Sequence, residues 1–291
     1  MKGSGTQADP FEPTTWLEFV TAIGTEGAYV EFPPEPGVID VSSLGFFNIG
    51  TNNINCPILC TSINGNGWTI HGLSWQNSYM FGKKVTGDVT IKNLNFTSFL
   101  GFLNSGNYAD FFYFSKGEIL IDNCVFTGTL DNNGFEYHYQ NNLTYNQCSL
   151  TFELKHGAGI NQHAYTASEM VNCNIKLTGS TSTTGNIINA KPFDFCYLRG
   201  ALTFTGNSAF LLKDNGSTST LHYSVIDIDL INGGSGNSIT IDNRGAKIVN
   251  KDKIKGFTTI TLDDDEFAVT KEQFCDAAYL KQIGFAIGVK S

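Results

Sequence analysis

Apolar and polar residues alternate in several short segments of the chain, and three of these segments place a cysteine at the same point. The segments are residues 121–126, 145–150 and 170–175, and Cys124, Cys148 and Cys173 lie 24 and then 25 residues apart. Alternation with a period of two is typical of a strand with one buried face, whereas a helix repeats its apolar residues every three or four positions. The pattern therefore predicts short strands that recur once per coil of a repetitive fold.

Two further segments, residues 91–96 and 197–202, fit the same pattern on either side of the three. Parallel strands stacked about 4.8 Å apart would place equivalent residues of all five segments in columns along the molecule. The first buried column is expected to contain Leu94, Cys124, Cys148, Cys173 and Gly200. The second is expected to contain Phe96, Phe126, Leu150, Ile175 and Leu202. A third column of amides, able to bond from coil to coil, comprises Asn93, Asn123, Gln147 and Asn172.

This pattern predicts an all-β chain folded as a parallel β-helix, or solenoid, with a helical element at each end. Thr14 and Thr15 precede an apolar stretch that Gly24 ends, which predicts a short N-terminal capping helix. Thr270 and Gln273 form a capping box for a C-terminal helical segment. We predict an extension at residues 1–13, the β-helix with its N-terminal cap at 14–262, and a C-terminal helical cap or association segment at 263–291.

Composition supports a folded, turn-rich β protein and argues against two classes of partner. Charged residues are only 15% of the chain, which has 31 glycines and 23 phenylalanines. The net charge is −9, and basic residues cluster only modestly, in residues 247–255, so nucleic acid is not expected as a partner. No run of about 18 apolar residues occurs, so membrane insertion is not expected.

The cysteines suggest folding in a reducing compartment. Their number, seven, is odd, and at least three are expected in one buried column; only Cys56 and Cys60 are spaced so that they could pair. No CxxC pair or histidine cluster accompanies them, so zinc is not expected. The acidic residues 263–266 lack the spacing of a calcium loop and are interpreted as a solvated turn rather than a calcium site. Neither a metal nor a cofactor is therefore predicted, and no signal peptide is seen.

Three segments resemble parts of known proteins. Residues 3–11 (GSGTQADPF) resemble the start that precedes β-solenoid repeats in many surface and phage proteins. Residues 63–70 (INGNGWTI) resemble the first turn of right-handed parallel β-helices of the pectate-lyase-like superfamily. Residues 276–285 (DAAYLKQIGF) are similar to the ends of minor structural proteins of phages that infect gut bacteria. The resemblance covers the two ends and the first coil.

The resemblance implies a right-handed β-helix in a phage virion, made in the host cytoplasm and located in the particle. It implies a non-enzymatic structural protein, a tail or capsid appendage, that contacts other virion proteins and presents its surface to a host receptor or glycan. Such proteins are commonly homotrimers, and the apolar C-terminal residues 285–289 are expected either to pack under the C-terminal helix or to join a neighbouring subunit.

Candidate binding chemistry is densest in the adjacent residues Glu136, Tyr137, His138 and Tyr139. Tyrosine rings can stack on sugars and a carboxylate can accept hydroxyl hydrogen bonds, so this segment is the predicted glycan-binding site. Further isolated acids and histidines are Asp110, Asp194, Asp214, His156 and His163. Because no two acids share a fixed spacing on one coil, no catalytic residue is assigned. The alternative is a polysaccharide depolymerase, a lyase or glycoside hydrolase of tail-spike type; a bacterial adhesin is disfavoured because no signal peptide is seen.

Overall fold

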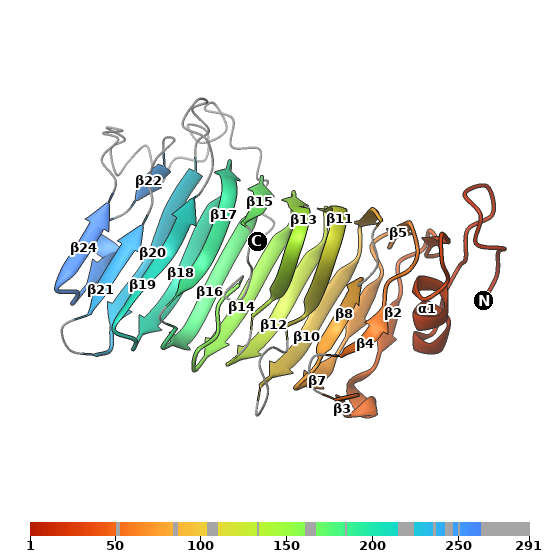
Figure 1. Cartoon of the computed structure of the whole chain (residues 1–291), viewed down its shortest axis with the longest axis horizontal. Coiled ribbons are helices and arrows are strands. Elements are labelled where there is room, and N and C mark those ends of the chain that lie inside the picture. The colour runs from red at the N-terminus through yellow and green to blue at the C-terminus, as the bar shows by residue number, and fades with distance from the viewer. Residues whose placement is uncertain are drawn as a thin grey trace.

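In a computed structural model, the chain winds into an elongated parallel β-solenoid (Figure 1). The structure describes residues 1–50, 53–83, 87–103, 110–132, 134–160, 167–183, 185–214, 224–234, 237–241, 247–249 and 251–262. Each coil contributes strands to two parallel sheets, and each sheet has 12 strands within these residues. The predicted all-β parallel β-helix is thus confirmed. The predicted C-terminal helical segment, the acidic run at 263–266 and the apolar residues 285–289 lie outside the described residues.

Neighbouring strands of each sheet come from successive coils. The first sheet has the order β1 (Tyr29–Glu31), β5 (Ser62–Asn64), β9 (Val89–Lys92), β11 (Phe112–Asp122), β13 (Glu136–Asn146), β15 (Ser168–Val171), β17 (Asn186–Asp194), β19 (Ser208–Asp214), β21 (Ser238–Ile241) and β24 (Thr259–Leu262). Beside β11 it also contains β8 (Tyr79–Lys83), which pairs with β4 (Ile54–Pro57). All of these pairings are parallel, as expected for a chain that returns to the same side after each coil.

The second sheet forms the other long side of the solenoid. Its order is β2 (Val38–Asp40), β6 (Thr69–His71), β10 (Asn95–Phe102), β12 (Val125–Asp131), β14 (Ser149–Lys155), β16 (Asn174–Thr181), β18 (Tyr197–Phe204), β20 (Ser224–Asn232) and β22 (Lys247–Val249). Three short strands extend it: β7 (Ser74–Gln76) and β3 (Phe46–Phe47) beside β10, and β23 (Ile254–Lys255) beside β20. Two 3₁₀ turns, Ser42–Leu44 and Lys251–Lys253, complete the described elements.

The predicted cysteine column is present, with one correction to its membership. Cross-strand register places Leu94, Cys124, Cys148 and Cys173 in line, and all four are buried. The next member is Cys196 rather than Gly200, because Asn174 pairs with Tyr197 and the backbone N–H of Cys173 donates to Cys196 Sγ at 3.4 Å. All six described cysteines are buried and none of them forms a disulfide, so Cys56 and Cys60 are not joined.

The predicted copy at residues 197–202 was displaced by four residues. Ile175 faces Leu198 rather than Leu202, and Gly200 lies opposite Leu177 inside β18. Gly200 has φ 119°, and a Cβ there would lie 2.0 Å from the Leu177 carbonyl oxygen, so only glycine fits without a backbone shift.

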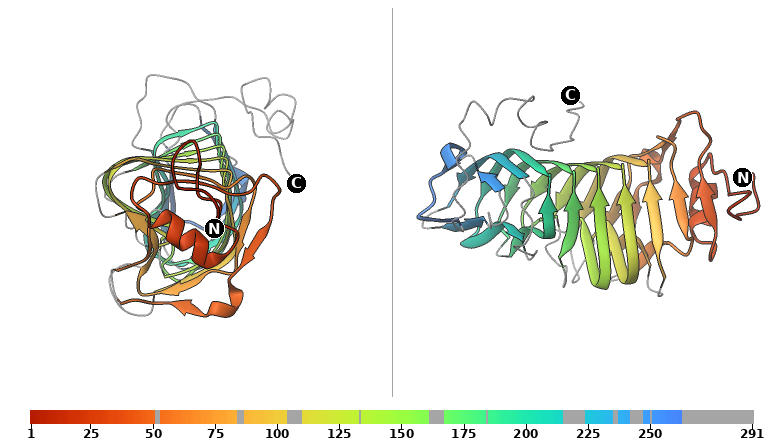
Figure 2. Two further views of the ribbon diagram at one scale, coloured as in Figure 1. Left: turned by 90° about the vertical axis from the view of Figure 1, so that its right-hand side faces the viewer. Right: turned by 90° about the horizontal axis from the view of Figure 1, so that it is seen from above.

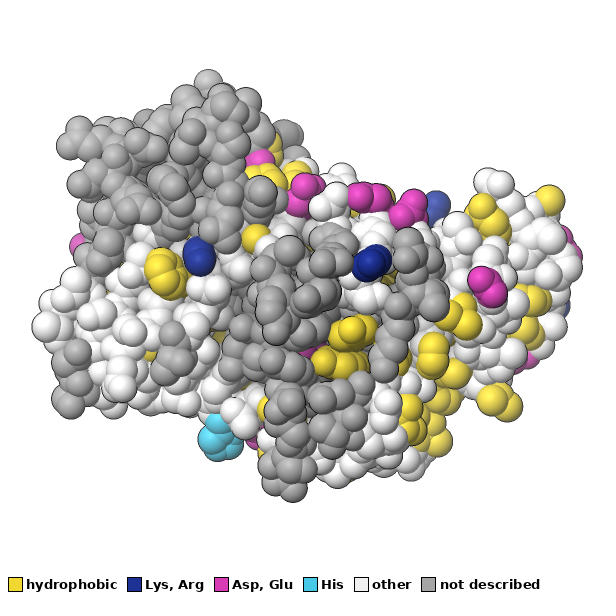
Figure 3. Space-filling model, in the orientation of Figure 1, with side chains coloured by type: hydrophobic (Ala, Val, Ile, Leu, Met, Phe, Trp, Pro, Cys, Tyr) yellow, Lys and Arg dark blue, Asp and Glu magenta, His cyan; other side chains and the backbone are white. Residues whose placement is uncertain are grey.

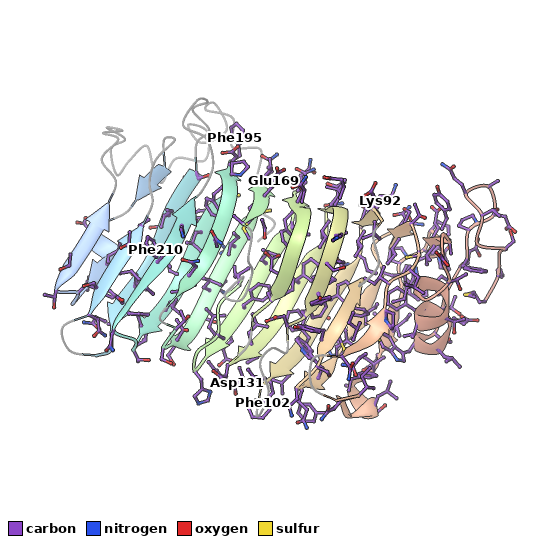
Figure 4. All side chains as sticks on the ribbon, viewed as in Figure 1. Lys92, Phe102, Asp131, Glu169, Phe195 and Phe210 are labelled. Carbon is purple, nitrogen blue, oxygen red and sulfur yellow. The ribbon has the colours of Figure 1, made fainter. Side chains whose placement is uncertain are left out.

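The amide column lies at the turn between the two sheets, where the backbone adopts a left-handed conformation. The φ angles are 54° for Asn93, 50° for Asn123, 54° for Gln147 and 53° for Asn172, and Phe195 (52°) takes the equivalent position in the next coil. Asparagine tolerates this conformation better than most residues, which explains its recurrence. The expected coil-to-coil bonding is seen where Asn123 Nδ2 donates to Asn93 Oδ1 at 2.8 Å and Asn93 Nδ2 to Asn64 Oδ1 at 3.0 Å. Figure 4 shows Phe195, Lys92 and Glu169 along this edge of the solenoid.

The N-terminal helix closes one end of the solenoid, as predicted. Helix α1 (Trp16–Ile23) begins after Thr15, whose hydroxyl accepts from the Glu18 N–H at 3.3 Å, and ends at Gly24. Figure 2 shows the helix lying across the end of the first coils. Phe19 is buried against Phe32 at 5.5 Å between ring centroids. The helix therefore covers apolar surface that an open end would expose.

The segment before the helix also protects an edge. Phe11 forms a parallel bridge with Val30 of β1, so this segment extends the first sheet by one position. The division of the chain at residues 13/14 and 262/263 stays a prediction. No helix in the described residues is long and apolar enough to cross a membrane.

Candidate functional site

The outer face of the second sheet brings together polar side chains that are far apart in the sequence. Each strand contributes one residue, three positions after its member of the cysteine column, to a row that runs along the solenoid. This central row consists of Thr97, Thr127, Thr151, Lys176, Arg199 and Asp227. Each of these side chains is partly exposed. The row thus presents aligned hydroxyl groups, then two cations and a carboxylate, at the spacing of stacked strands, about 4.8 Å.

Around Asp227 the face carries a group of interacting polar side chains. Lys253 Nζ lies 2.9 Å from Asp227 Oδ1 and 4.0 Å from Asp229 Oδ2. The Tyr197 hydroxyl donates to Asp227 Oδ2 at 3.4 Å. The hydrogen bond with Asp227 raises the pKa of Lys253, so the ammonium remains charged beside the carboxylate. Partial burial, followed by the charge of Asp227, raises the pKa of Tyr197 and keeps the phenol protonated.

The two cations of the central row are held differently. Lys176 and Arg199 are direct register partners on β16 and β18. Arg199 Nε donates to the Asn174 side-chain oxygen at 3.2 Å, a neutral partner on the neighbouring strand. Within the described part of the chain, no carboxylate lies within ion-pair distance of either cation.

A second polar group occupies the far end of β12 and β14. His156 Nδ1 lies 2.5 Å from Asp131 Oδ1, and the imidazole is 73% exposed. The Thr129 hydroxyl donates to Glu153 Oε2 at 3.0 Å, and Lys155 Nζ lies 3.3 Å from the same oxygen. Figure 4 shows Asp131 at the edge of the solenoid opposite Lys92 and Glu169. The first two contacts join neighbouring coils and the Lys155–Glu153 pair lies within β14; surface ion pairs of this kind contribute little to stability.

The predicted glycan-binding segment does not lie on this face. Glu136, at the start of β13, is 0% exposed, so its carboxylate does not face solvent, and sugar binding by Glu136 stays a prediction. It lies opposite Phe112 on the inner side, where the Ser168 hydroxyl donates to Glu136 Oε1. Burial, with the nearby charge of Glu136, raises the pKa of Tyr145 well above its usual range. The side chains of Tyr137, His138 and Tyr139 lie outside the described residues, and sugar binding by them stays a prediction.

The other predicted acids and histidines, where the structure describes them, do not assemble into a site. Asp110 is also fully buried, and its Oδ1 accepts from the Gly134 N–H at 2.7 Å. Asp194 lies at the end of β17. The Asp214 side chain and His163 are outside the described residues. Among the residues that are described, no three histidine, cysteine or acidic side chains are grouped so that they could hold a metal ion.

Sequence reasoning missed the group of Tyr197, Arg199 and Asp227 because Asp227 meets the other two only through the register of two successive coils. A signal was nevertheless present: each residue of the central row follows its member of the cysteine column by three positions. Comparison with protein-family models, with curated protein sequences and with solved structures found no match for this chain. The resemblance of its ends to phage proteins therefore stays a prediction.

Proposed function

We propose that this chain is a non-enzymatic structural protein of a phage virion, a tail or capsid appendage that holds a host surface glycan against the outer face of its second sheet. The phage assignment is supported by the resemblance of the two ends and the first coil. The binding role is supported by one observation above all: the central row, an uninterrupted line of partly exposed polar side chains on a stiff, regularly spaced surface.

Such a face suits an extended polysaccharide. Hydroxyl groups of Thr127 and Thr151 repeat at about the strand spacing and can bond to successive sugar residues. Tyr197, half-buried beside this row, offers an aromatic ring on which a sugar can stack. A face built from paired strands loses little freedom on binding, which favours affinity.

The state of the polar groups supports binding rather than cleavage. A lyase needs a group that readily takes a proton, whereas the raised pKa of Tyr197 keeps its phenol protonated. A hydrolase needs one protonated and one free carboxyl group. Asp227 is instead occupied by Lys253 and Tyr197.

The N-terminal end is suited to contact with other virion proteins. Residues 1–50 contain seven acidic residues and one lysine. Figure 3 shows hydrophobic side chains gathered over these coils. Leu44, Phe46 and Ile49 are each more than half exposed, close to the edge strand β3. An exposed apolar area in an acidic part of the chain fits a neighbouring virion protein with a basic, partly apolar surface. Association into a homotrimer stays a prediction.

A polysaccharide depolymerase remains the second candidate, because one feature favours it. Asp227 and Asp229 lie two residues apart on β20, so both side chains project from the same face of the strand. Most glycoside hydrolases need two carboxyl groups on the same exposed face to cleave a glycosidic bond.

One pair of measurements distinguishes the two candidates. The purified chain is applied to an array of bacterial capsular and cell-wall polysaccharides, and every polymer that binds is then incubated with it and assayed for new reducing ends. We expect binding to at least one polymer and no rise in reducing ends. Release of reducing ends that the double variant Asp227→Asn, Asp229→Asn abolishes would establish the depolymerase instead, and failure to bind any polymer would contradict the glycan-binding role.

A further inference from the structure

The two cations at the middle of the outer face have an arrangement that fold stability does not explain. Lys176 and Arg199 lie directly opposite each other on adjacent parallel strands. Like charges at directly opposite positions of a sheet destabilise it. A pair of this kind needs either a nearby acid to neutralise it or a role outside folding.

The acids that could neutralise the pair are already engaged. Asp227 is the register neighbour of Arg199, but it bonds to Lys253 and Tyr197. Asp229 lies nearest to Lys253 among the cations. Within the described residues, the positive charge of Lys176 and Arg199 is therefore available to an anion from outside.

The surroundings orient the pair toward a particular kind of anion. Arg199 uses Nε to bond to Asn174, which fixes the guanidinium while leaving its terminal N–H groups for another acceptor. A guanidinium matches a carboxylate through two parallel hydrogen bonds. Tyr197, two residues before Arg199 on the same face of β18, places an aromatic ring beside this charge.

An acidic sugar chain would use each of these groups. Its ring can stack on the tyrosine, its carboxylate can bind the two cations, and its hydroxyls can bond to the row of threonines. We propose that Lys176, Arg199 and Tyr197 form a subsite for an acidic sugar, and that the glycan held by the second sheet is a carboxylated polysaccharide lying along the central row. This inference rests on the proposed glycan-binding function and names the class of glycan.

The test uses the full chain with three carboxylated polymers as probes: polygalacturonate, alginate and hyaluronan. Each is compared with its carboxyl-reduced form, in which the uronic acids have become neutral sugars. We expect the chain to bind at least one acidic polymer and to bind its reduced form at least about tenfold more weakly, because a charged hydrogen bond contributes more than a neutral one. Equal binding of the acidic and reduced forms, or binding of neither, would overturn the acidic subsite.

Variants locate the subsite. Arg199→Gln is expected to weaken binding of the acidic polymer at least about tenfold. Lys176→Gln should weaken it by a smaller factor, since lysine acts as a point charge. The matched control is Lys213→Gln, which removes a cation from β19 in the first sheet and should leave binding unchanged. Unchanged binding in both Arg199→Gln and Lys176→Gln would contradict the assignment.

A stability measurement separates a binding role from a structural one. If Lys176 serves a ligand, Lys176→Gln relieves the repulsion with Arg199 and should raise the melting temperature of the free protein. A lower melting temperature would show that Lys176 stabilises the fold and would overturn the proposal. If the polysaccharide array finds only neutral ligands, the acidic subsite fails while the glycan-binding function stands; if it finds no ligand, both fail.

Discussion

Replacing Phe126 by alanine is expected to lower the free energy of unfolding by about 3–5 kcal/mol, the usual cost of removing a large aromatic side chain from a close-packed core. Phe126 is completely buried. Its ring stacks on Phe96 of the preceding coil, with centroids 5.4 Å apart, and packs edge-on against Phe135 at 5.0 Å. Phe96 is held within β10, and Phe135, just before β13, is held by the hydrogen bond of its backbone N–H to the Ile160 carbonyl at 2.7 Å, so neither is free to fill the space.

Urea unfolding followed by circular dichroism measures this change. Phe210→Ala is the matched control, since Phe210 lies on the outer surface of β19, is 37% exposed and contacts Lys213 across its ring. We expect that control to lose about 1 kcal/mol or less. A loss of unfolding free energy for Phe126→Ala no larger than that for Phe210→Ala would show that the second buried column is not the core of the fold.

Alkaline pH is expected to destabilise the protein through its buried thiols. Burial raises the pKa of Cys124 from 9.0 to about 12. In the unfolded chain the thiol would lose its proton near pH 9, whereas in the folded chain the thiol stays protonated up to about pH 12. The unfolded state therefore binds fewer protons across this interval, and the stability that is complete below pH 9 is lost as the pH rises toward 12.

The loss of unfolding free energy caused by the Cys124 thiol alone is large enough to measure. Each pH unit between about 9 and 12 should cost about 1.4 kcal/mol, or about 4 kcal/mol in total. The free energy of unfolding is measured at several pH values above 9 for the wild type and for Cys124→Ala, and we expect a flatter pH dependence in the variant. Ser149→Ala, beside the cysteine column but without an ionising group, should keep the wild-type slope. Parallel slopes for all three proteins would show that the Cys124 thiol is accessible to solvent.

The cysteine column shows how far the sequence predicts this fold. Cys124, Cys148 and Cys173 share a local pattern and near-equal spacing, so the coil and its buried side follow from alternation alone. The next coil was misplaced because Phe195 occupies the position at which earlier coils have asparagine or glutamine. Without the amide as a marker, a copy displaced by four residues matched the apolar pattern equally well.

The proposed binding face was not predicted by the same reasoning. Glu136 is polar, and a polar residue in an alternating segment is ordinarily assigned to the outer side; here it points inward, next to Ser168. Its orientation depends on pairing with Phe112, a contact between coils that local sequence does not encode. The alignment of Arg199 with Lys176, by contrast, could have been predicted, since both residues follow their cysteine by three positions once Cys196 is placed correctly in the column.

The central claim is that successive coils stack in register, so that one outer row has evenly spaced members. Thr129, Glu153, Thr178, Ala201 and Asp229 are successive register partners on the second sheet. Spin labels on cysteines introduced in pairs report the distances by electron paramagnetic resonance; Cys275, the one cysteine outside the described residues, is replaced by serine so that it cannot be labelled. The pairs 153/201, 129/201 and 129/229 should be about 10, 14 and 19 Å apart, an increment of about 4.8 Å per coil. Distances that do not increase in this order would contradict the stacked solenoid and, with it, the parallel central row on which the proposed glycan site depends.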